Sequence, residues 1–181
     1  MLNASIYKGM YTDPETEAGL AAALRSITNP VDKKVVLLCI GTDRNIPDSL
    51  GPLVGTMLNE RNTSLSIVGS LDNPLHARNL VGRINSIRNN DPGCLELAID
   101  ASLGSRDEVG LIEVKPGGII PGRAMQKNLP RVGDISILGK VGIYSGGGGT
   151  GHITQGRLNL VYAMARVITR GIIRWEKEQN R

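Results

Sequence analysis

A continuously apolar segment, a turn rich in glycine and proline, and a helical segment follow one another at residues 35–59, and this unit constrains the fold most. The run "VVLLCI" (35–40) is apolar at every position, which is typical of a strand covered on both faces. The turn "GTDRNIPDSLGP" (41–52) leads into a segment that predicts a helix over 50–59. A buried strand that feeds a helix in this way indicates an α/β fold.

The other segments continue this alternation. Apolar spacing predicts further helices over 13–27, 72–87 and 156–178, and further strands over 65–71, 94–100, 109–118 and 133–144. We place Asn73 at the N-cap of the helix over 72–87, with Pro74 in its first position. The strand that begins at Cys94 is expected to end at Asp100. Together these elements predict a mainly parallel sheet with helices on both faces.

Length and composition indicate one soluble globular domain. The 181 residues are 40% hydrophobic and 21% charged, so we assign 1–181 to a single domain, with 1–29 as an N-terminal helical extension. No apolar run is long enough for a membrane span, and the N-terminus has no apolar signal core. We therefore expect a cytoplasmic protein that has no membrane contact. Two cysteines form neither a disulfide framework nor a metal-ligand cluster.

Four aspartates lie where the predicted strands end. Asp43 and Asp48 follow the first strand, Asp72 follows the second, and Asp100 ends the third. Sites in such sheets lie beyond the carboxyl ends of the strands, so these side chains are expected to converge on one rim if the strands are neighbours.

Asp48 and Asp100 are our candidate catalytic pair. Two carboxylates held close together cannot ionise independently, so one keeps its proton and acts as an acid while the other acts as a base. Asp48 is expected at a helix start, which favours its anion, and Asp100 at the mouth of an apolar strand, which favours its neutral form. The structural alternative is that Asp48 caps a helix and Asp100 binds backbone N–H groups. For Asp72 we favour a structural turn with Asn73 and Pro74.

Metal and nucleotide sites find weaker support. His76 could reach the same rim and His152 lies in a glycine loop, but neither shows the paired spacing of a zinc site. The run "SGGGGTGH" (145–152) satisfies GxGxxG but lacks a following strand, so it predicts a mobile loop. The segment 115–130 is also rich in Gly and Pro, and both loops could cover the acidic rim. We expect no metal and no cofactor.

The net charge of +4 permits an acidic partner. Arg166, Arg170 and Arg174 recur at every fourth position of the last helix, which favours a solvated face over an acidic-protein or nucleic-acid surface. With no interleaved aromatic residues, direct nucleic-acid binding is not expected.

Several motifs resemble those of the YyaC family of sporulation proteins from spore-forming bacteria. They are "GTDRNIPDSLGPLVGT", "LDNPLHARNL", "AIDASLG", "LPRVGDISILG" and "LNLVYAMARVI", and the resemblance runs from about residue 30 to 173. That family is similar to the germination protease of spores and to the hydrogenase maturation proteases, which implies a three-layer α/β/α sandwich.

The resemblance also implies roles for particular residues. The two catalytic aspartates of the germination protease lie in motifs that match "PDSLGP" and "IDASLG" here, and these correspond to Asp48 and Asp100. The hydrogenase maturation proteases add a histidine that helps to hold the nickel of their substrate. This chain has no histidine in the matching "LPRVGDISILG" segment, where Asp134 is the nearest polar substitute. That departure weakens the case for metal binding.

These observations lead to one main hypothesis about function. We expect an endopeptidase of sporulation or germination that uses Asp48 and Asp100, with Asp43, Asp72 and Asp134 shaping the site. Its partner would be a protein or peptide substrate, such as small acid-soluble spore proteins. The alternatives are a non-catalytic protein-binding module of the spore and a metal-assisted hydrolase. Apolar residues nearly encircle the last helix, which makes a homo-oligomer plausible.

Overall fold

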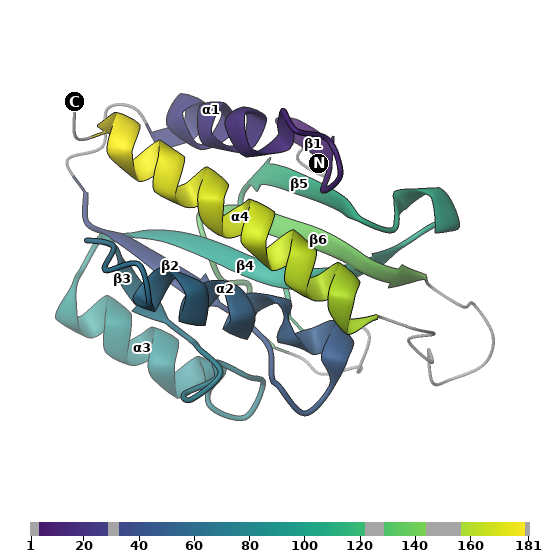
Figure 1. Ribbon diagram of the computed structural model, residues 1–181. Helices are drawn as coiled ribbons and strands as arrows, with labels where there is room; N and C mark the ends of the chain where they lie inside the picture. Colours follow the sequence, from purple (N-terminus) through teal and green to yellow (C-terminus); the bar gives the residue numbers. More distant parts are fainter. Residues whose placement is uncertain (1–3, 29–32, 122–128, 144–156, 180–181) are drawn as a thin grey trace.

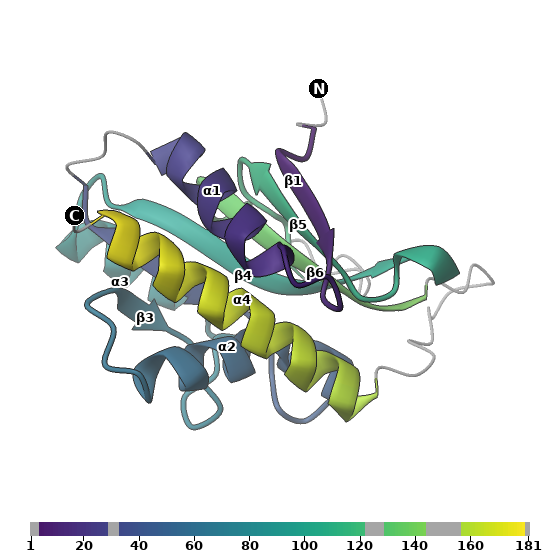
Figure 2. The ribbon, with the colours of Figure 1, turned by 45° about the horizontal axis from the view of Figure 1, so that its top comes forward.

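One sheet with helices on both faces organises the computed structural model, which describes residues 4–28, 33–121, 129–143 and 157–179. Within these ranges, six strands are arranged in the order β1-β5-β6-β4-β2-β3 (Figures 1 and 2). The elements are β1 (Tyr7–Met10), α1 (Thr16–Thr28), β2 (Val35–Cys39), the 3-10 helix η1 (Ile46–Ser49), α2 (Leu50–Asn59), β3 (Ser66–Val68), α3 (Leu80–Asn90), β4 (Leu95–Gly104), the 3-10 helix η2 (Arg106–Glu108), β5 (Leu111–Pro116), β6 (Ile135–Ile143) and α4 (Leu158–Gln179).

The alternation of side chains along β2 shows why the sheet is covered on both faces. Leu37 and Cys39 belong to the larger apolar cluster, which contains α1, α2 and α4. Val36 and Leu38 belong to a second cluster, which contains α3. Successive residues of a strand point to opposite faces, so a strand that is apolar at every position needs helices on both sides. The predicted α/β/α layering is confirmed.

Strand directions divide the sheet into two parts. The strands β6, β4, β2 and β3 are parallel to one another. In contrast, β5 runs antiparallel to both β6 and β1. The sheet is therefore mixed, and its parallel part places the carboxyl ends of β2 and β4 at the same edge, as the candidate site requires.

The N-terminal segment is part of the main fold and not a helical extension. Helix α1 was predicted, but the strand β1 before it was not, and β1 pairs with β5 at the edge of the sheet. Leu20 and Leu24 of α1 are fully buried in the larger cluster, and α1 lies beside α4 (Figure 2). The strand was missed because "YKGM" is short and weakly apolar, and only its pairing with β5 makes it a strand.

Two predicted boundaries were wrong. Helix α3 begins at Leu80, with Asn79 at its N-cap position, and not near Asn73. The preceding segment is held otherwise: Leu75 forms a parallel bridge with Ile40 and accepts a hydrogen bond from the Gly41 N–H, and a turn at 77–79 then leads into the helix. Strand β4 continues beyond Asp100 to Gly104, because β6 pairs with it along that whole length.

Packing within the chain accounts for the apolar residues that nearly encircle α4. It lies between α1 and α2, and eight of its residues are buried, so much of the surface that pointed to an oligomer is covered within the chain. Leu158 and Tyr162 remain exposed near its first turns. In the part of the chain that the structure describes, no helix is long and apolar enough to cross a membrane.

Glu113 on β5 forms ion pairs at the antiparallel edge of the sheet, where β1 pairs with β5. Its side chain is 3% exposed and lies 3.0 Å from Lys8 Nζ on β1 and 2.9 Å from Lys115 Nζ on β5. Burial alone would raise the pKa of Glu113, but Lys115 and Lys8 outweigh it and lower the pKa to about 2. We predict that Glu113→Gln lowers the free energy of unfolding at neutral pH by about 1–3 kcal/mol, because it leaves both ammonium groups unpaired.

The pH dependence of the Glu113 effect follows from the sign of its shift. A lowered carboxyl pKa stabilises the fold above the unfolded value, and this contribution is lost as pH falls toward about 2. Urea unfolding at several pH values measures it, with Glu60→Gln on an exposed turn as the control. Equal stability of the two variants at neutral pH would contradict the prediction.

Candidate active site

The turn after β2 folds back onto the end of its own strand. Gly41 has a φ of +139°, and a Cβ built there would lie 2.0 Å from the backbone oxygen of Asp48. The Thr42 N–H donates a hydrogen bond to that same oxygen at 2.9 Å. Only glycine combines this conformation with so close an approach, so "GTDRNIPDS" is a loop that returns Asp48 to the strand end.

The first turn of α2 is held equally closely. A Cβ at Gly51 would lie 2.1 Å from the backbone oxygen of Ile40, so the helix begins directly against the last residues of β2. Ser49, and not Asp48, occupies the N-cap position of α2, and its hydroxyl donates to the Ile46 oxygen at 2.7 Å. The structural alternative for Asp48, a helix cap, is therefore not what the structure shows.

Asp100 lies on the neighbouring strand at the point where β2 leaves the sheet. The Ile40 N–H donates to the oxygen of Ile99 at 2.8 Å, so the last paired position of β2 is one residue before Asp100. The Asp100 carboxylate is 9% exposed and accepts a hydrogen bond from the Ala101 N–H at 2.8 Å. This bond is local, and it agrees in part with the structural alternative for Asp100.

Asp48 and Asp100 interact electrostatically, as the sequence hypothesis requires of a pair. Burial is the main cause that raises the pKa of Asp100 well above its usual range, and the negative charge of Asp48 raises it further. The hydrogen bond from the Ala101 N–H lowers this pKa but does not outweigh them. Burial also raises the pKa of Asp48 to about 6, and His76 and the Thr42 N–H hold it from rising further. Burial thus favours the protonated form of both carboxyls, the Asp48 charge does so further at Asp100, and His76 favours the anion of Asp48.

His76 reaches the same rim, although the sequence favoured a surface or packed histidine. It follows Leu75, which is bridged to the end of β2, and its backbone N–H donates to Asn79 Oδ1 at 2.9 Å. Its Nδ1 is buried and has no hydrogen-bond partner among the described residues. When His76 is protonated, its charge favours the Asp48 anion. The signal in the sequence was its position just after the second parallel strand, which the helix prediction obscured.

Asp43 and Asp72 lie in the loops near this rim, and neither is among the groups that shift the pKa of Asp48 or Asp100. Both side chains are exposed in the loops that follow β2 and β3. Asp43 accepts a long bond from its neighbour Thr42 Oγ1 at 3.4 Å. Their role in shaping the site stays a prediction.

Asp134 lies at the opposite end of the sheet. Its Oδ2 accepts the Glu96 N–H at 2.9 Å, and its own N–H donates to the Glu96 oxygen at 2.7 Å. Glu96 in turn accepts two bonds from Arg88, at 2.6 and 2.9 Å. Asp134 thus joins the amino ends of β4 and β6. Its predicted place beside Asp48 and Asp100 was wrong, because it begins the strand β6 and the pair lies at the carboxyl ends.

Two predicted loops fall partly or wholly outside the described residues. The glycine run 145–152, with His152, lies outside them, as do residues 122–128 of the second loop. Within the described ranges, no three His, Cys, Asp or Glu side chains come close enough together to hold a metal ion.

The raised pKa values predict that both aspartates cost the fold stability at neutral pH. A carboxyl whose folded pKa lies above its unfolded value binds more protons when folded, so the free energy of unfolding falls as pH rises from about 4 to about 6. We predict that Asp48→Asn raises the free energy of unfolding by about 1–2 kcal/mol at neutral pH. At about pH 4 the effect should vanish.

Asp100→Asn is expected to stabilise the protein in the same pH window, because an amide fills the same buried space without charge and still accepts the Ala101 bond. Thermal unfolding at both pH values measures these changes, with Asp107→Asn on the exposed η2 as the control. A loss of stability at neutral pH in both variants would show that the aspartates serve the fold.

Comparison with known proteins bears out the resemblance to YyaC. The family described as "Protein of unknown function (DUF1256)" matches residues 8–171. The protein YyaC of Bacillus subtilis (strain 168), described as uncharacterized, is 40% identical over 148 residues, which cover 81% of this chain and 72% of YyaC.

A solved structure confirms the fold. The [NiFe] hydrogenase maturation protease HycI of Thermococcus kodakarensis KOD1 superposes with a TM-score of 0.50 over 83% of this chain and 98% of HycI. The two sequences are 17% identical, so the likeness concerns architecture alone. With a match that spans most of its length and a relative at 40% identity, the chain belongs to the DUF1256 family.

Proposed function

We propose that the protein is an endopeptidase whose catalytic groups are Asp48 and Asp100. The observation that supports this most is the coupled pair, in which burial and the Asp48 charge keep Asp100 protonated while His76 favours the Asp48 anion. Groups whose pKa values are displaced by burial and by each other are characteristic of catalytic sites. The likeness to the fold of a maturation protease is consistent with the proposal.

In the proposed reaction the two carboxyl groups have complementary tasks. Asp48 takes a proton from a water molecule, whose oxygen attacks the carbonyl carbon of the peptide bond. Asp100 gives its proton to the amide nitrogen as the C–N bond breaks, which yields a free amine and a carboxylic acid. Proton exchange through solvent then moves the proton from Asp48 to Asp100 and restores the starting state.

Exposed apolar side chains near the pair favour a peptide over a small polar substrate. Ile46 is 43% exposed in η1, two residues before Asp48, and Leu158 and Tyr162 are 56% and 46% exposed on the first turns of α4. Figures 1 and 2 place these turns beside η1, and the two elements are in contact. Such a surface suits the apolar side chains of an extended polypeptide.

The proposed setting is sporulation or germination in the cytoplasm of the mother cell, forespore or spore. This setting and the substrate class, small acid-soluble spore proteins, rest on the resemblance to YyaC and to the germination protease.

The test is cleavage of candidate substrates by the purified protein. It is incubated with small acid-soluble spore proteins, and separately with a spore lysate, between about pH 4 and 8, and products are identified by mass spectrometry. We predict that Asp48→Asn and Asp100→Asn each lower kcat/KM by a factor of about 1,000 or more, because each removes one proton-transfer group.

Asp107→Asn serves as the control, because it makes the same chemical change in the exposed η2. Cleavage that survives both site substitutions would contradict the assignment. Intact substrates at every pH, with a folded wild-type protein, would favour a non-catalytic binding role.

His76 gives a second and finer test. The base must be ionised, so the rate is expected to rise with pH through the pKa of Asp48, about 6. We predict that His76→Gln moves this rising limb to higher pH, because the variant loses the positive charge that favours the Asp48 anion. The kcat/KM profile measures the shift, and an unchanged limb would show that His76 does not act on Asp48.

A further inference from the structure

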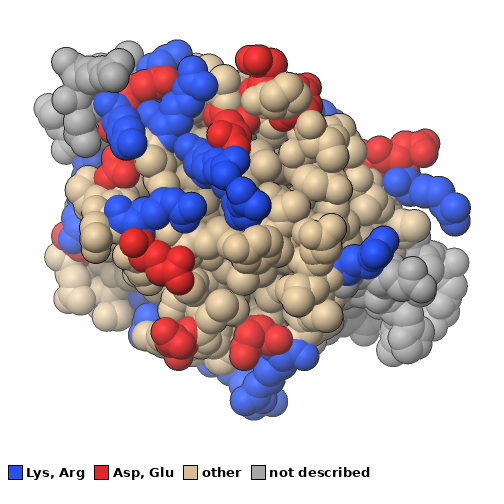
Figure 3. Space-filling model, in the orientation of Figure 1, with Lys and Arg blue, Asp and Glu red and all other residues tan. Residues whose placement is uncertain are grey.

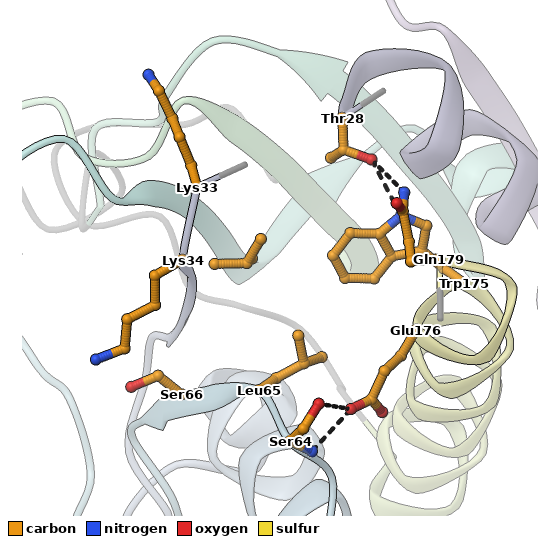
Figure 4. Close-up of a pocket in the computed structure, with 10 residues that line it drawn as sticks. Thr28, Lys33, Lys34, Ser64, Leu65, Ser66, Trp175, Glu176 and Gln179 are labelled. Atoms are coloured by element: carbon orange, nitrogen blue, oxygen red, sulfur yellow. Dashed lines mark hydrogen bonds between the residues drawn. The ribbon is translucent and has the colours of Figure 1, made fainter. Parts of the chain in front are cut away.

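Two hollows join at the amino end of the sheet, far from the aspartate pair. The first, of about 270 Å³, lies between the start of β2, the start of β3 and the last turns of α4 (Figure 4). The second, of about 610 Å³, lies between the end of α2 and α4. Ser64 and Glu176 line both hollows and are hydrogen-bonded to each other, so the hollows adjoin across this contact; together they are named here the amino-end groove.

Cations outnumber carboxylates in the lining of the amino-end groove. Its lining contains a single carboxylate, Glu176, and five cationic side chains: Lys33, Lys34, Arg61, Arg170 and Lys177. In the same orientation as Figure 1, the space-filling view shows Lys and Arg gathering over the C-terminal half of α4, whereas the surface around its N-terminal half is largely uncharged (Figure 3).

Glu176 is ionised and offsets one of these cations, and hydrogen bonds fix its carboxylate in place. Oε1 accepts bonds from the Ser64 N–H at 2.7 Å and from the Ser64 hydroxyl at 2.6 Å, as Figure 4 shows. Oε2 accepts the Thr63 hydroxyl at 2.7 Å. Burial opposes ionisation of Glu176, but these bonds outweigh it and lower the pKa of Glu176. The carboxylate therefore fastens α4 to the segment before β3.

Two of the five cations have acidic partners outside the groove. Lys34 Nζ lies 2.7 Å from Asp91, and Arg170 Nη1 lies 3.1 Å from Glu17. All four side chains are between 33% and 55% exposed, and exposed ion pairs of this kind are weak. Among the described residues, Lys33 and Lys177 form no ion pair. With Glu176, Asp91 and Glu17 set against the five cations, the groove keeps an excess of two positive charges.

We propose that the amino-end groove binds an acidic segment of a partner protein. The five cations that line the groove complement a row of Asp and Glu side chains, and the Ser66 hydroxyl adds a polar contact. Leu65 and Ile173 supply apolar contact for an extended chain. Trp175 is 2% exposed and its Nε1 donates to Thr28 Oγ1, so it offers no open ring on which a base could stack.

This interaction does not depend on the proposed peptidase activity. Lys33 and Lys34 precede β2 and Ser64 precedes β3, whereas Asp48 and Asp100 lie beyond or near the opposite ends of the parallel strands. A partner in the groove would leave the pair free.

Fluorescence anisotropy tests the proposal with the full chain. The probe is a fluorescein-labelled peptide of alternating Glu and Ser, and a sister peptide carries Gln in place of each Glu. We expect the acidic peptide to bind and the Gln peptide not to bind at about 50 mM salt, and the affinity to fall as salt rises to about 200 mM. Lys33→Glu and Lys177→Glu, which lie in different elements, should each weaken binding about three- to tenfold.

Arg106→Glu is the matched control, because it reverses one charge on the exposed η2, outside the groove. Circular dichroism and thermal unfolding verify that all three variants fold. Three results would overturn the proposal: equal affinity for the two peptides, equal weakening by Arg106→Glu, or tighter binding of a DNA duplex than of the acidic peptide at the same salt.

Discussion

The contact between Gly51 and the Ile40 backbone sets the position of everything at the carboxyl edge of the sheet. Because a Cβ at Gly51 would lie 2.1 Å from the Ile40 oxygen, α2 starts at van der Waals distance from the strand. The ten residues between them must then close a tight loop, which Gly41 permits through its positive φ. Asp48 is carried by that loop, so its place beside β4 follows from backbone packing and not from its own bonds.

The unequal lengths of β2 and β4 complete the arrangement. Strand β2 leaves the sheet after Cys39, while β4 continues to Gly104 along β6. Asp100 therefore lies inside a strand, where it is desolvated, yet beside the gap that β2 leaves. Desolvation of a carboxyl disfavours its anion, and the surrounding apolar layers offset that cost for the fold as a whole. Burying an ionisable group in this way lowers the free energy of unfolding, a cost that is common at functional sites.

The sequence predicted the parallel core, because apolar runs, turn glycines and strand ends are local signals. The same signals selected Asp48 and Asp100 as a candidate pair, whose role stays a prediction. Prediction from the sequence failed where a segment takes its conformation from a distant neighbour. Residues 72–79 carry good helix-start residues, but the bridge from Leu75 to Ile40 holds this segment at the end of β2, and the helix begins only after a turn at 77–79. Strand β1 exists only through its pairing with β5. Asp134 was assigned from its position in a motif, and its place at the amino end of β6 follows from strand direction.

The packing of α1 against α4 has a consequence for biosynthesis. These helices carry ion pairs between Arg25 and Glu178 and between Glu17 and Arg170, so each contact joins residues separated by 153 positions. Until α4 emerges from the ribosome, the part of the α1 surface that packs against α4 is uncovered. At typical translation speeds this delay lasts on the order of ten seconds, during which the nascent chain exposes a surface that chaperones recognise.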